Sequence, residues 1–357
     1  MHPVLAARLR NQHLARPSLT APEVVASMAA MQAQDYAGAI WALGLRVPGA
    51  TASMIEQALE AGAIVRTHPM RGTHHFVARD DIRWMLGLLA PRGLARIAWH
   101  WRDLGLDAAT LSAATRALTR ALEGGKHLVR SEVAAALTRA RISPDGPRLS
   151  NIIYHAELTG LVCSGARRGK QITIALLDQR VPAQRAMERA AALAELARRY
   201  FTTRGPATLH DLVWWSGLTM ADARAGAERA TGLLSETIDG TVYWRGASRP
   251  GRATGKRAYL LPPYDEYAVA YRKRALLCSA PAGASSFGET TLLGPIVVLD
   301  GAVAGSWKRT IGPRAVQIDV APWRRWTADE AAAVEQAAER YAAFVERPAD
   351  LRVVSRS

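Results

Sequence analysis

The sequence has few cysteines and no long apolar run. Only Cys163 and Cys278 occur among its 357 residues, far apart in the chain, so neither a disulfide framework nor a cysteine metal site is expected. No segment approaches the roughly 18 uninterrupted apolar residues of a membrane span. The N-terminal residues lack the apolar region of a secretory signal. We therefore expect a cytoplasmic protein without a membrane partner.

Acidic residues are scarce relative to basic ones. The chain has 46 Lys and Arg against 31 Asp and Glu, a formal net charge of +15, and an isoelectric point near 10.5. The excess is arginine, whose planar guanidinium suits paired hydrogen bonds to phosphate, so nucleic acid is the leading partner class. A GC-rich genome would also enrich alanine and arginine, and part of the charge can have that origin. With 49% hydrophobic residues, the chain predicts about two or three folded domains with sizeable cores.

Helices followed by two short strands are predicted in residues 1–105, an order typical of a winged helix. The helices are expected at Val4–Ala15, Ala21–Gln32 and Thr51–Ala61, and the strands at Ile64–His68 and Thr73–Val77. The turn between the strands is Pro69–Gly72. A connecting helical layer follows, in which Trp84, Trp99 and Trp101 are expected in the core or an interface.

The same order recurs in residues 106–180 and 181–246. The second copy has a basic turn, residues 165–170, where a wing would lie. The third has a helix-turn-helix corner at Ser216–Thr219 and a hairpin turn at Asp239-Gly240. Three winged helices in tandem is the simplest interpretation, and a generic helical bundle is the alternative.

Residues 258–357 predict a small β-rich domain closed by a helix. Strands are expected at Ile296–Leu299, Val303–Trp307 and Val316–Val320, and the helix at Thr327–Val345 with Glu330 exposed. The preceding linker is basic and contains Arg252, so it is either a DNA-tracking loop or a solvated connector. The predicted fold class is α+β, mainly helical, with three tandem winged-helix (helix-turn-helix) units and a small C-terminal β-rich domain.

A polar cluster, Gln32, Gln34 and Asp35, closes an otherwise apolar predicted helix, Glu23–Ala33. On a helix the two amides would point about 200° apart, but at a helix end or in an extended turn they can project the same way. Because an amide both donates and accepts hydrogen bonds, such a pair can hold a water molecule or a sugar oxygen. The alternative is that the glutamines cap the helix and Asp35 is a solvated acid.

The predicted hairpin contains three histidines, His68, His74 and His75. Strand alternation would place His74 and His75 on opposite faces, and no acidic or cysteine partner lies within the hairpin. We therefore expect no metal and no other cofactor. Hydrogen bonding near nucleic acid, or simple surface exposure, is the preferred interpretation.

Four motifs together resemble bacterial winged-helix DNA glycosylases of the AlkZ/YcaQ type. They are Met31–Tyr36, Val65–Thr73, Leu261–Tyr267 and Gly305–Arg309. The resemblance extends over nearly the whole chain. Gln32-Ala33-Gln34 is similar to the Gln-x-Gln signature of the AlkZ-like branch, with a small middle residue, and His68 stands where that family more often has tryptophan.

The resemblance implies a monofunctional glycosylase that removes alkylated purines, including interstrand crosslinks, in repair or in self-resistance to alkylating antibiotics. A 7-alkylated purine is cationic and leaves readily through an oxocarbenium-like sugar, so a strong general acid is unnecessary. Gln32 and Gln34 would hold the attacking water and the deoxyribose, with Asp35 orienting them. The motif contains no lysine, which favours hydrolysis over Schiff-base chemistry.

The expected partner is double-stranded DNA carrying alkylated purines, bound by a monomer. The side chains assigned to DNA contact are Arg66, His68, Arg71, His74, Arg167, Arg168, Lys170, Arg252, Lys308 and Arg309. Two rival classes stay open: a winged-helix transcription regulator without catalysis, which would bind a defined sequence, and a protein-interaction module. Binding to plain and alkylated duplex would separate these classes.

Overall fold

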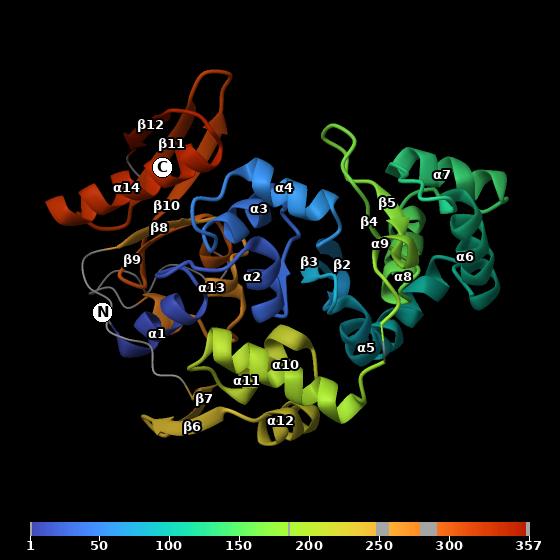
Figure 1. The fold of residues 1–357 in the computed structure, drawn as a ribbon, viewed down its shortest axis with the longest axis horizontal. Helices are drawn as coiled ribbons and strands as arrows, with labels where there is room; N and C mark the ends of the chain where they lie inside the picture. The colour runs from blue at the N-terminus through green and yellow to red at the C-terminus, as the bar shows by residue number, and fades with distance from the viewer. Residues whose placement is uncertain (1, 185, 248–256, 279–290, 355–357) are drawn as a thin grey trace. The chain divides into compact units, whose positions relative to one another are not determined.

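The computed structural model describes residues 2–184, 186–247, 257–278 and 291–354, so Arg252 lies outside the described residues. Backbone contacts divide the chain into two compact units, and each is described by itself. The first unit comprises Met1–Glu56 and Ala194–Ser357, and the second comprises Gln57–Leu193. Helices and strands are mixed in the described parts, as the α+β prediction requires (Figure 1).

The first unit begins with helices and a short strand. Its elements before the sheet are α1 (Pro3–Asn11), α2 (Ala21–Ser27), β1 (Ala30–Gln32), α3 (Tyr36–Gly44), α4 (Ala52–Glu60, which runs into the second unit), α10 (Arg189–Arg204, which begins in the second unit), α11 (Leu209–Ser216), α12 (Met220–Arg229), β6 (Leu233–Ile238) and β7 (Thr241–Gly246). Gly217 ends α11 in the left-handed conformation, with φ 76°, and the Thr219 side chain accepts from Asp222 to start α12. The predicted helix-turn-helix corner is therefore confirmed as a local structure.

A five-stranded sheet forms the C-terminal part of the first unit. Its elements are β8 (Ala258–Leu261), α13 (Glu266–Val269), the short helices η1 (Ala275–Cys278) and η3 (Thr291–Leu293), β9 (Ile296–Leu299), β10 (Ala302–Ile311), β11 (Val316–Pro322), α14 (Ala328–Phe344) and β12 (Ala349–Val353). The strand order is β12-β11-β10-β9-β8, antiparallel except for the parallel pair β11 and β12. Helix α14 packs against β8 and β12 (Figure 1).

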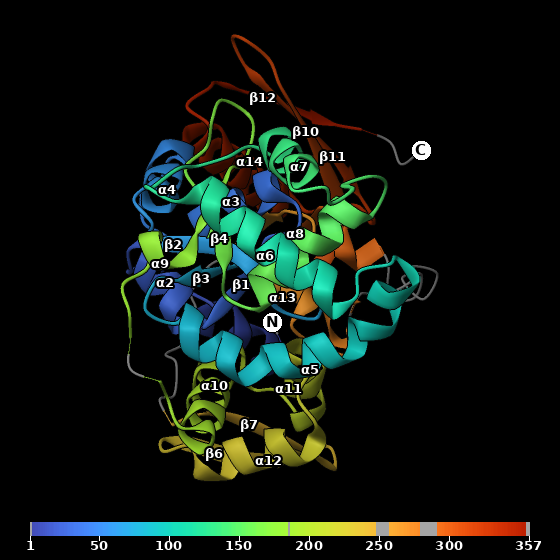
Figure 2. The same cartoon turned by 90° about the vertical axis from the view of Figure 1, so that its right-hand side faces the viewer.

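The second unit combines helices with two hairpins. Its elements are β2 (Ile64–Met70), β3 (Thr73–Ala78), α5 (Ile82–Asp103), α6 (Ala108–Leu122), α7 (Arg130–Arg139), α8 (Arg148–Leu158), β4 (Val162–Ser164), β5 (Ile174–Leu176) and α9 (Leu177–Arg180). Strands β2 and β3 pair in antiparallel register, and so do β4 and β5. Helix α5 runs as one long helix (Figure 2). Helix α8 contacts α5, β2 and β4, and thereby joins the two hairpins.

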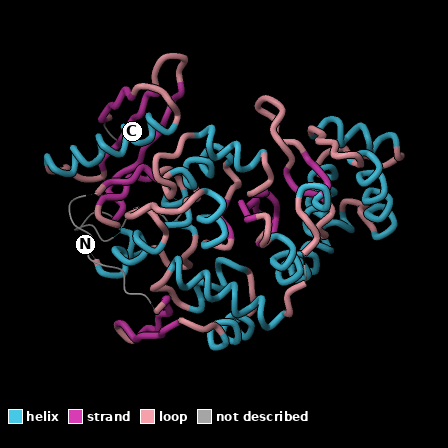
Figure 3. Tube along the Cα trace, in the orientation of Figure 1, coloured by secondary structure: helices cyan, strands magenta, loops and turns pink. Residues whose placement is uncertain are grey.

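The predicted order of helices followed by a hairpin is present in all three segments (Figure 3). Hairpin β2–β3 follows α4, β4–β5 follows α8, and β6–β7 follows α12. The contact-based units have other boundaries, because hairpin β2–β3 groups with residues up to Leu193. The division into three winged helices therefore stays a prediction.

The helix predicted over Glu23–Ala33 is wrong in its second half. Helix α2 ends at Ser27, Ala29 adopts a left-handed φ of 61°, and β1 follows. The reason is not local. The guanidinium of Arg204 donates to the carbonyls of Met28 and Ala30, 2.9 and 2.8 Å away, and so satisfies them outside a helix.

Three smaller expectations also need correction. Helix α3 was not predicted, and its start at Tyr36 directly follows the polar cluster. Trp84 and Trp101 are buried as expected, but Trp99 is 59% exposed. Glu330 was expected to be exposed and is buried, because its backbone N–H donates to Thr327 and its carboxylate accepts from Arg324 at 2.7 and 2.8 Å.

Candidate active site

The polar cluster lies in an extended connection between β1 and α3. Gln32 is the last residue of β1 and is half-buried, Gln34 is exposed in a bend, and Asp35 is half-buried at the N-cap of α3. Asp35 has extended backbone angles of −85° and 102°. The two amides therefore do not lie on a helix, which would have separated them by about 200°. Residues 30–35 form the segment that we call the strap.

A buried ion pair holds this strap. Glu266, the first residue of α13, accepts a hydrogen bond from the backbone N–H of Gln32 at 2.8 Å. Its other carboxylate oxygen accepts from the Arg204 guanidinium at 2.7 and 2.9 Å, and from the Trp215 indole at 3.0 Å. The side chains of Arg204 and Glu266 are 0% and 1% exposed. Since Arg204 also binds the carbonyls before Gln32, one ion pair fixes the backbone on both sides of Ala30.

A second buried ion pair lies beside the first. Arg46 donates two hydrogen bonds to Asp265, at 2.8 and 2.9 Å, and a third to Gln12 at 3.1 Å. Asp265 also caps α13 by accepting from the backbone N–H of Tyr267. Sequence reasoning used these acids as part of a motif and gave them no role. The available signal was an Asp-Glu pair within a strongly apolar stretch, because buried acids are seldom found without a cationic partner.

Asp35 lies close to the aromatic pair formed by Trp307 of β10 and Tyr341 of α14. A Cβ on Gly38 would approach its Oδ2 to 2.7 Å, so a larger residue there would displace the Asp35 carboxylate. Burial raises the pKa of Tyr341, and the charge of Asp35 adds to this increase, while Arg309 opposes it. The guanidinium carbon of Arg309 is 5.5 Å from the Tyr341 ring centre and 5.7 Å from that of Trp307. Three of the four motifs thus meet in one unit.

Two of the predicted DNA-contact residues lie next to each other on β10. The Lys308 side chain is 76% exposed, with its ammonium 4.0 Å from Asp319, whereas Arg309 is half-buried. Lys308 is therefore available to a ligand, and Arg309 is held against the aromatic pair.

The predicted basic wing is more constrained than expected. Arg168 donates to Glu132 at 2.7 Å and to the His127 carbonyl at 2.7 Å, so it is turned back onto the start of α7. Arg167 is half-buried and Lys170 is exposed. Of the three cations, Lys170 has the geometry expected of a flexible phosphate contact.

The hairpin arginines differ in position. The backbone N–H of Arg66 on β2 donates to Ser164 of β4 at 2.9 Å. Arg71 occupies the turn, where it and Gly72 have left-handed φ angles of 56° and 72°. Both arginine side chains are half-buried.

The hairpin histidines are turned inward. His68 contacts the carboxylate of Glu157 on α8, and the Nε2 of His74 lies 3.9 Å from the same oxygen. Burial lowers the pKa of His74, and the positive charge of Arg66 lowers it further. His75 is fully buried and contacts the Thr73 carbonyl at 2.8 Å. Glu157 was missed by sequence reasoning, although a glutamate within the apolar stretch that forms α8 was a usable signal.

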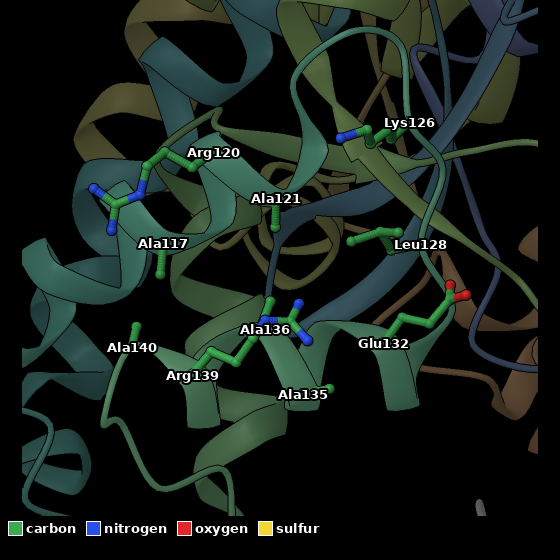
Figure 4. A pocket seen from close by; sticks show the side chains of 10 residues that line it. All are labelled: Ala117, Arg120, Ala121, Lys126, Leu128, Glu132, Ala135, Ala136, Arg139 and Ala140. Carbon is green, nitrogen blue, oxygen red and sulfur yellow. The ribbon is translucent and has the colours of Figure 1, made fainter.

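Each unit contains a cavity of its own. In the second unit, a groove of about 700 Å³ between α6 and α7 has an alanine-rich floor and the charged residues Arg120, Lys126, Glu132 and Arg139 at its edge (Figure 4). In the first unit, a cavity of about 600 Å³ is lined by Trp41, Tyr259 and Arg340 among others. Neither lining includes the glutamine motif. Within the described segments, no helix is long and apolar enough to cross a bilayer.

The model of the family described as DNA glycosylase AlkZ-like matches residues 25–344. This range contains all four motifs, and the chain belongs to that family. It is a DNA glycosylase, an enzyme that acts on N-glycosidic bonds.

A curated relative and a solved structure, both from Streptomyces sahachiroi, are similar to this chain. The curated relative, an interstrand DNA cross-link repair glycosylase, is 24% identical over 325 residues, which cover 85% of this chain and 86% of that protein. The solved structure of the DNA glycosylase AlkZ matches with a TM-score of 0.79 at 22% identity, covering 99% of this chain and 98% of the other. The structural match shows a shared fold.

Proposed function

We propose that this glycosylase hydrolyses the N-glycosidic bond of 7-alkylguanine-type adducts in duplex DNA, including interstrand crosslinks, without lyase chemistry. The observation that carries the proposal is the extended strap, whose backbone is fixed by Glu266 and Arg204 while Gln34 stays exposed. Membership of the AlkZ-like family supplies the class of reaction.

Hydrolysis of such an adduct requires the protein mainly to position the reacting groups. A 7-alkylated purine carries a positive charge and is a good leaving group, so the rate depends on a positioned water and on stabilisation of the developing sugar cation. Gln32 and Gln34 supply neutral amides that can accept from the water and contact the deoxyribose. Asp35, directly after Gln34 in the sequence, supplies a negative charge. Direct attack by this water needs no covalent enzyme intermediate.

Activity on crosslinks is proposed from the similarity to the Streptomyces sahachiroi interstrand DNA cross-link repair glycosylase. A crosslink joins two purines, and hydrolysis of one glycosidic bond would release one strand from the adduct. An exposed strap suits such a bulky substrate, because a deep enclosed pocket would exclude the second base and strand.

DNA binding is assigned to the basic balance of the chain and to the arginines and lysines named from the sequence, with three winged helices in tandem and the C-terminal β-rich domain as the scaffold. His68 and His74 are left out of this assignment because they are turned inward toward Glu157. The formal charge of +15 supports recruitment to phosphate by a monomer in the cytoplasm. Lys170 and Lys308 have the exposure that phosphate contact requires. A non-enzymatic transcription regulator is not favoured, because the family match is to glycosylases.

The test is single-turnover release of 7-methylguanine, and of a bulky or crosslinked 7-alkylguanine, from a labelled duplex. Gln32→Ala, Gln34→Ala and the double variant are compared with the wild type. Gln336→Ala is the matched control, because this exposed glutamine lies on α14 in the same unit. Each variant is checked for folding and for DNA affinity.

We expect the motif variants to bind DNA and to lose at least about tenfold in the rate of release, as loss of one positioning contact in a transition state commonly does. The control should match the wild type. A wild type that releases no base from either substrate, yet binds one DNA sequence tightly, would replace the hydrolase with the regulator.

A further inference from the structure

Three side chains with metal-binding atoms converge in the second unit. They are His68 at β2, His74 at β3 and Glu157 at α8, and their candidate ligand atoms all lie within 4.8 Å of one another. The Nδ1 of His68 and the Nε2 of His74 approach the same carboxylate oxygen, Oε2 of Glu157. The two imidazole ring centres are 3.6 Å apart.

The cluster is shielded from solvent. The side chains of His68, His74 and Glu157 are 12%, 22% and 5% exposed. A carboxylate removed from water needs compensation, either from hydrogen bonds or from a cation. Two imidazoles aimed at one carboxylate oxygen supply hydrogen bonds through at most two N–H groups, or they supply two lone pairs to a shared ion.

We propose that His68, His74 and Glu157 form a binding site for a divalent transition-metal ion of the zinc class. Two imidazole nitrogens and one carboxylate oxygen are a common three-ligand set for Zn²⁺, with one position left to water. Mg²⁺ and Ca²⁺ prefer all-oxygen ligands and do not fit this set. The sequence predicted no metal here because the hairpin has no acidic residue, and the acid comes from α8, 89 residues after His68.

A bound ion requires the two imidazole rings, whose centres are 3.6 Å apart, to move apart. Zinc bonds of about 2.0–2.2 Å at tetrahedral angles place ligand atoms roughly 3.3–3.5 Å apart. The 3.9 Å between His74 Nε2 and Glu157 Oε2 needs a shift of a few tenths of an ångström, and the closer His68 contact must open. Rotation of the three side chains is the adjustment that the proposal requires. The positive charge of Arg66 acts on His74, so binding should be weaker than in closed four-ligand sites.

The bound ion would fasten hairpin β2–β3 to helix α8. Helix α8 already contacts the hairpin beside the cluster. The centre of the Tyr154 ring, one turn earlier on α8, lies 4.8 Å from the His68 ring centre. A Cβ on Gly72 at the hairpin turn would lie 3.4 Å from the Tyr154 hydroxyl. The ion would thus act as a cross-link in the scaffold, independent of Gln32 and Gln34.

The test uses full-length protein stripped with a chelator and then titrated with Zn²⁺ by calorimetry and with Co²⁺ by visible absorption. We expect one equivalent to bind, the Co²⁺ complex to show tetrahedral bands without a thiolate charge-transfer band, and Zn²⁺ to raise the thermal midpoint. His68→Ala, His74→Ala and Glu157→Gln should each lower affinity at least tenfold. His210→Ala is the control, because this exposed histidine lies on α11 in the other unit.

Two results would overturn the site: a wild type that binds no stoichiometric ion, or binding that persists unchanged in His68→Ala and His74→Ala. A thiolate band would assign the ion to a cysteine instead. If a variant fails to fold, the wild-type stoichiometry and Co²⁺ spectrum still decide. Base release and metal binding are measured separately, so failure of one proposal leaves the other intact.

Discussion

The carboxylate of Glu266 accepts a hydrogen bond from the backbone N–H of Gln32 at a distance of 2.8 Å. This bond crosses 234 residues of sequence and ends on the strap that holds the proposed catalytic amides. Arg204 binds the same carboxylate and the Ala30 carbonyl, so the strap is restrained through its backbone. Such restraint lowers the entropy that must be lost when the amides engage a water and a sugar.

The first prediction concerns Glu266→Gln, which keeps an acceptor for Gln32 but removes the negative charge opposite Arg204. A buried ion pair that loses one partner is destabilised by about 3–5 kcal/mol. We also expect slower base release, by at least about tenfold, with DNA affinity within about twofold of the wild type. Single-turnover kinetics and DNA titration below the unfolding transition measure this split.

Glu339→Gln is the control for this charge change, because Glu339 is exposed on α14. A folded Glu266→Gln variant with wild-type release would show that Glu266 is structural only. Equal losses in DNA affinity and in release would point to a displaced binding surface rather than to displaced amides.

The second prediction concerns the neighbouring pair Arg46 and Asp265, whose side chains are 0% and 1% exposed. Arg46→Met and Asp265→Asn should each lower the free energy of unfolding by about 3–5 kcal/mol, because each leaves an uncompensated buried group. The double variant should lose less than the sum, since no unpaired charge remains. Urea unfolding of the four proteins gives the coupling energy, and strictly additive losses would contradict a direct pairing.

The third prediction compares two glycines within helices. A Cβ on Gly44 of α3 would lie 2.3 Å from the Phe344 ring, so α3 and α14 pack too closely for alanine. Gly44→Ala should destabilise by about 1–3 kcal/mol through overpacking. A Cβ on Gly87 of α5 meets nothing within 4 Å, so Gly87→Ala should stabilise by about 0.5–1 kcal/mol through helix propensity. Thermal unfolding of both variants tests the opposite signs.

The parts of the fold that the sequence predicted well are those governed by neighbouring residues. Hairpin β6–β7 follows from the Asp239-Gly240 turn, where both residues have positive φ. Helix α14 follows from its Thr327 cap and apolar periodicity, and it was predicted to within one residue at each end. Strand β9 was predicted with its exact bounds. In each case the signal and the structure it specifies lie within a few residues.

The features that were not predicted from the sequence depend on residues far away in the chain. The end of α2 is set by Arg204, which lies 174 residues after the carbonyl of Ala30 that it binds. Strand β12 exists because it pairs in parallel with β11, and its own residues show no strong alternation. The inward turn of His68 depends on Glu157 of α8. Gln32 and Gln34 were named as site candidates from sequence, with an extended turn as one of the arrangements considered, but strand β1 at Ala30–Gln32 was not predicted.

The fourth prediction concerns stability at acidic pH. Burial lowers the pKa of His13 from its ordinary 6.5 to about 4, and the charge of Arg46 contributes to the decrease. The unfolded chain therefore binds more protons at this position between pH 4 and 6.5, so the free energy of unfolding should fall as the pH drops through that window. The loss should reach about 2–3 kcal/mol near pH 4 and should be absent above pH 7.

His13→Asn isolates this contribution. His13 has a left-handed φ of 61°, which asparagine tolerates better than other non-glycine residues, and asparagine can still bond to the Ser27 hydroxyl that contacts the imidazole. Carboxylates such as Glu23 titrate equally in both proteins, so their effect cancels in the difference between the two stability curves. That difference should be flat above pH 7 and should change in favour of the variant as the pH falls from 6.5 to 4. Parallel curves over this window would mean that the imidazole of His13 becomes charged in the folded protein without penalty, and that the charge of Arg46 is screened from it.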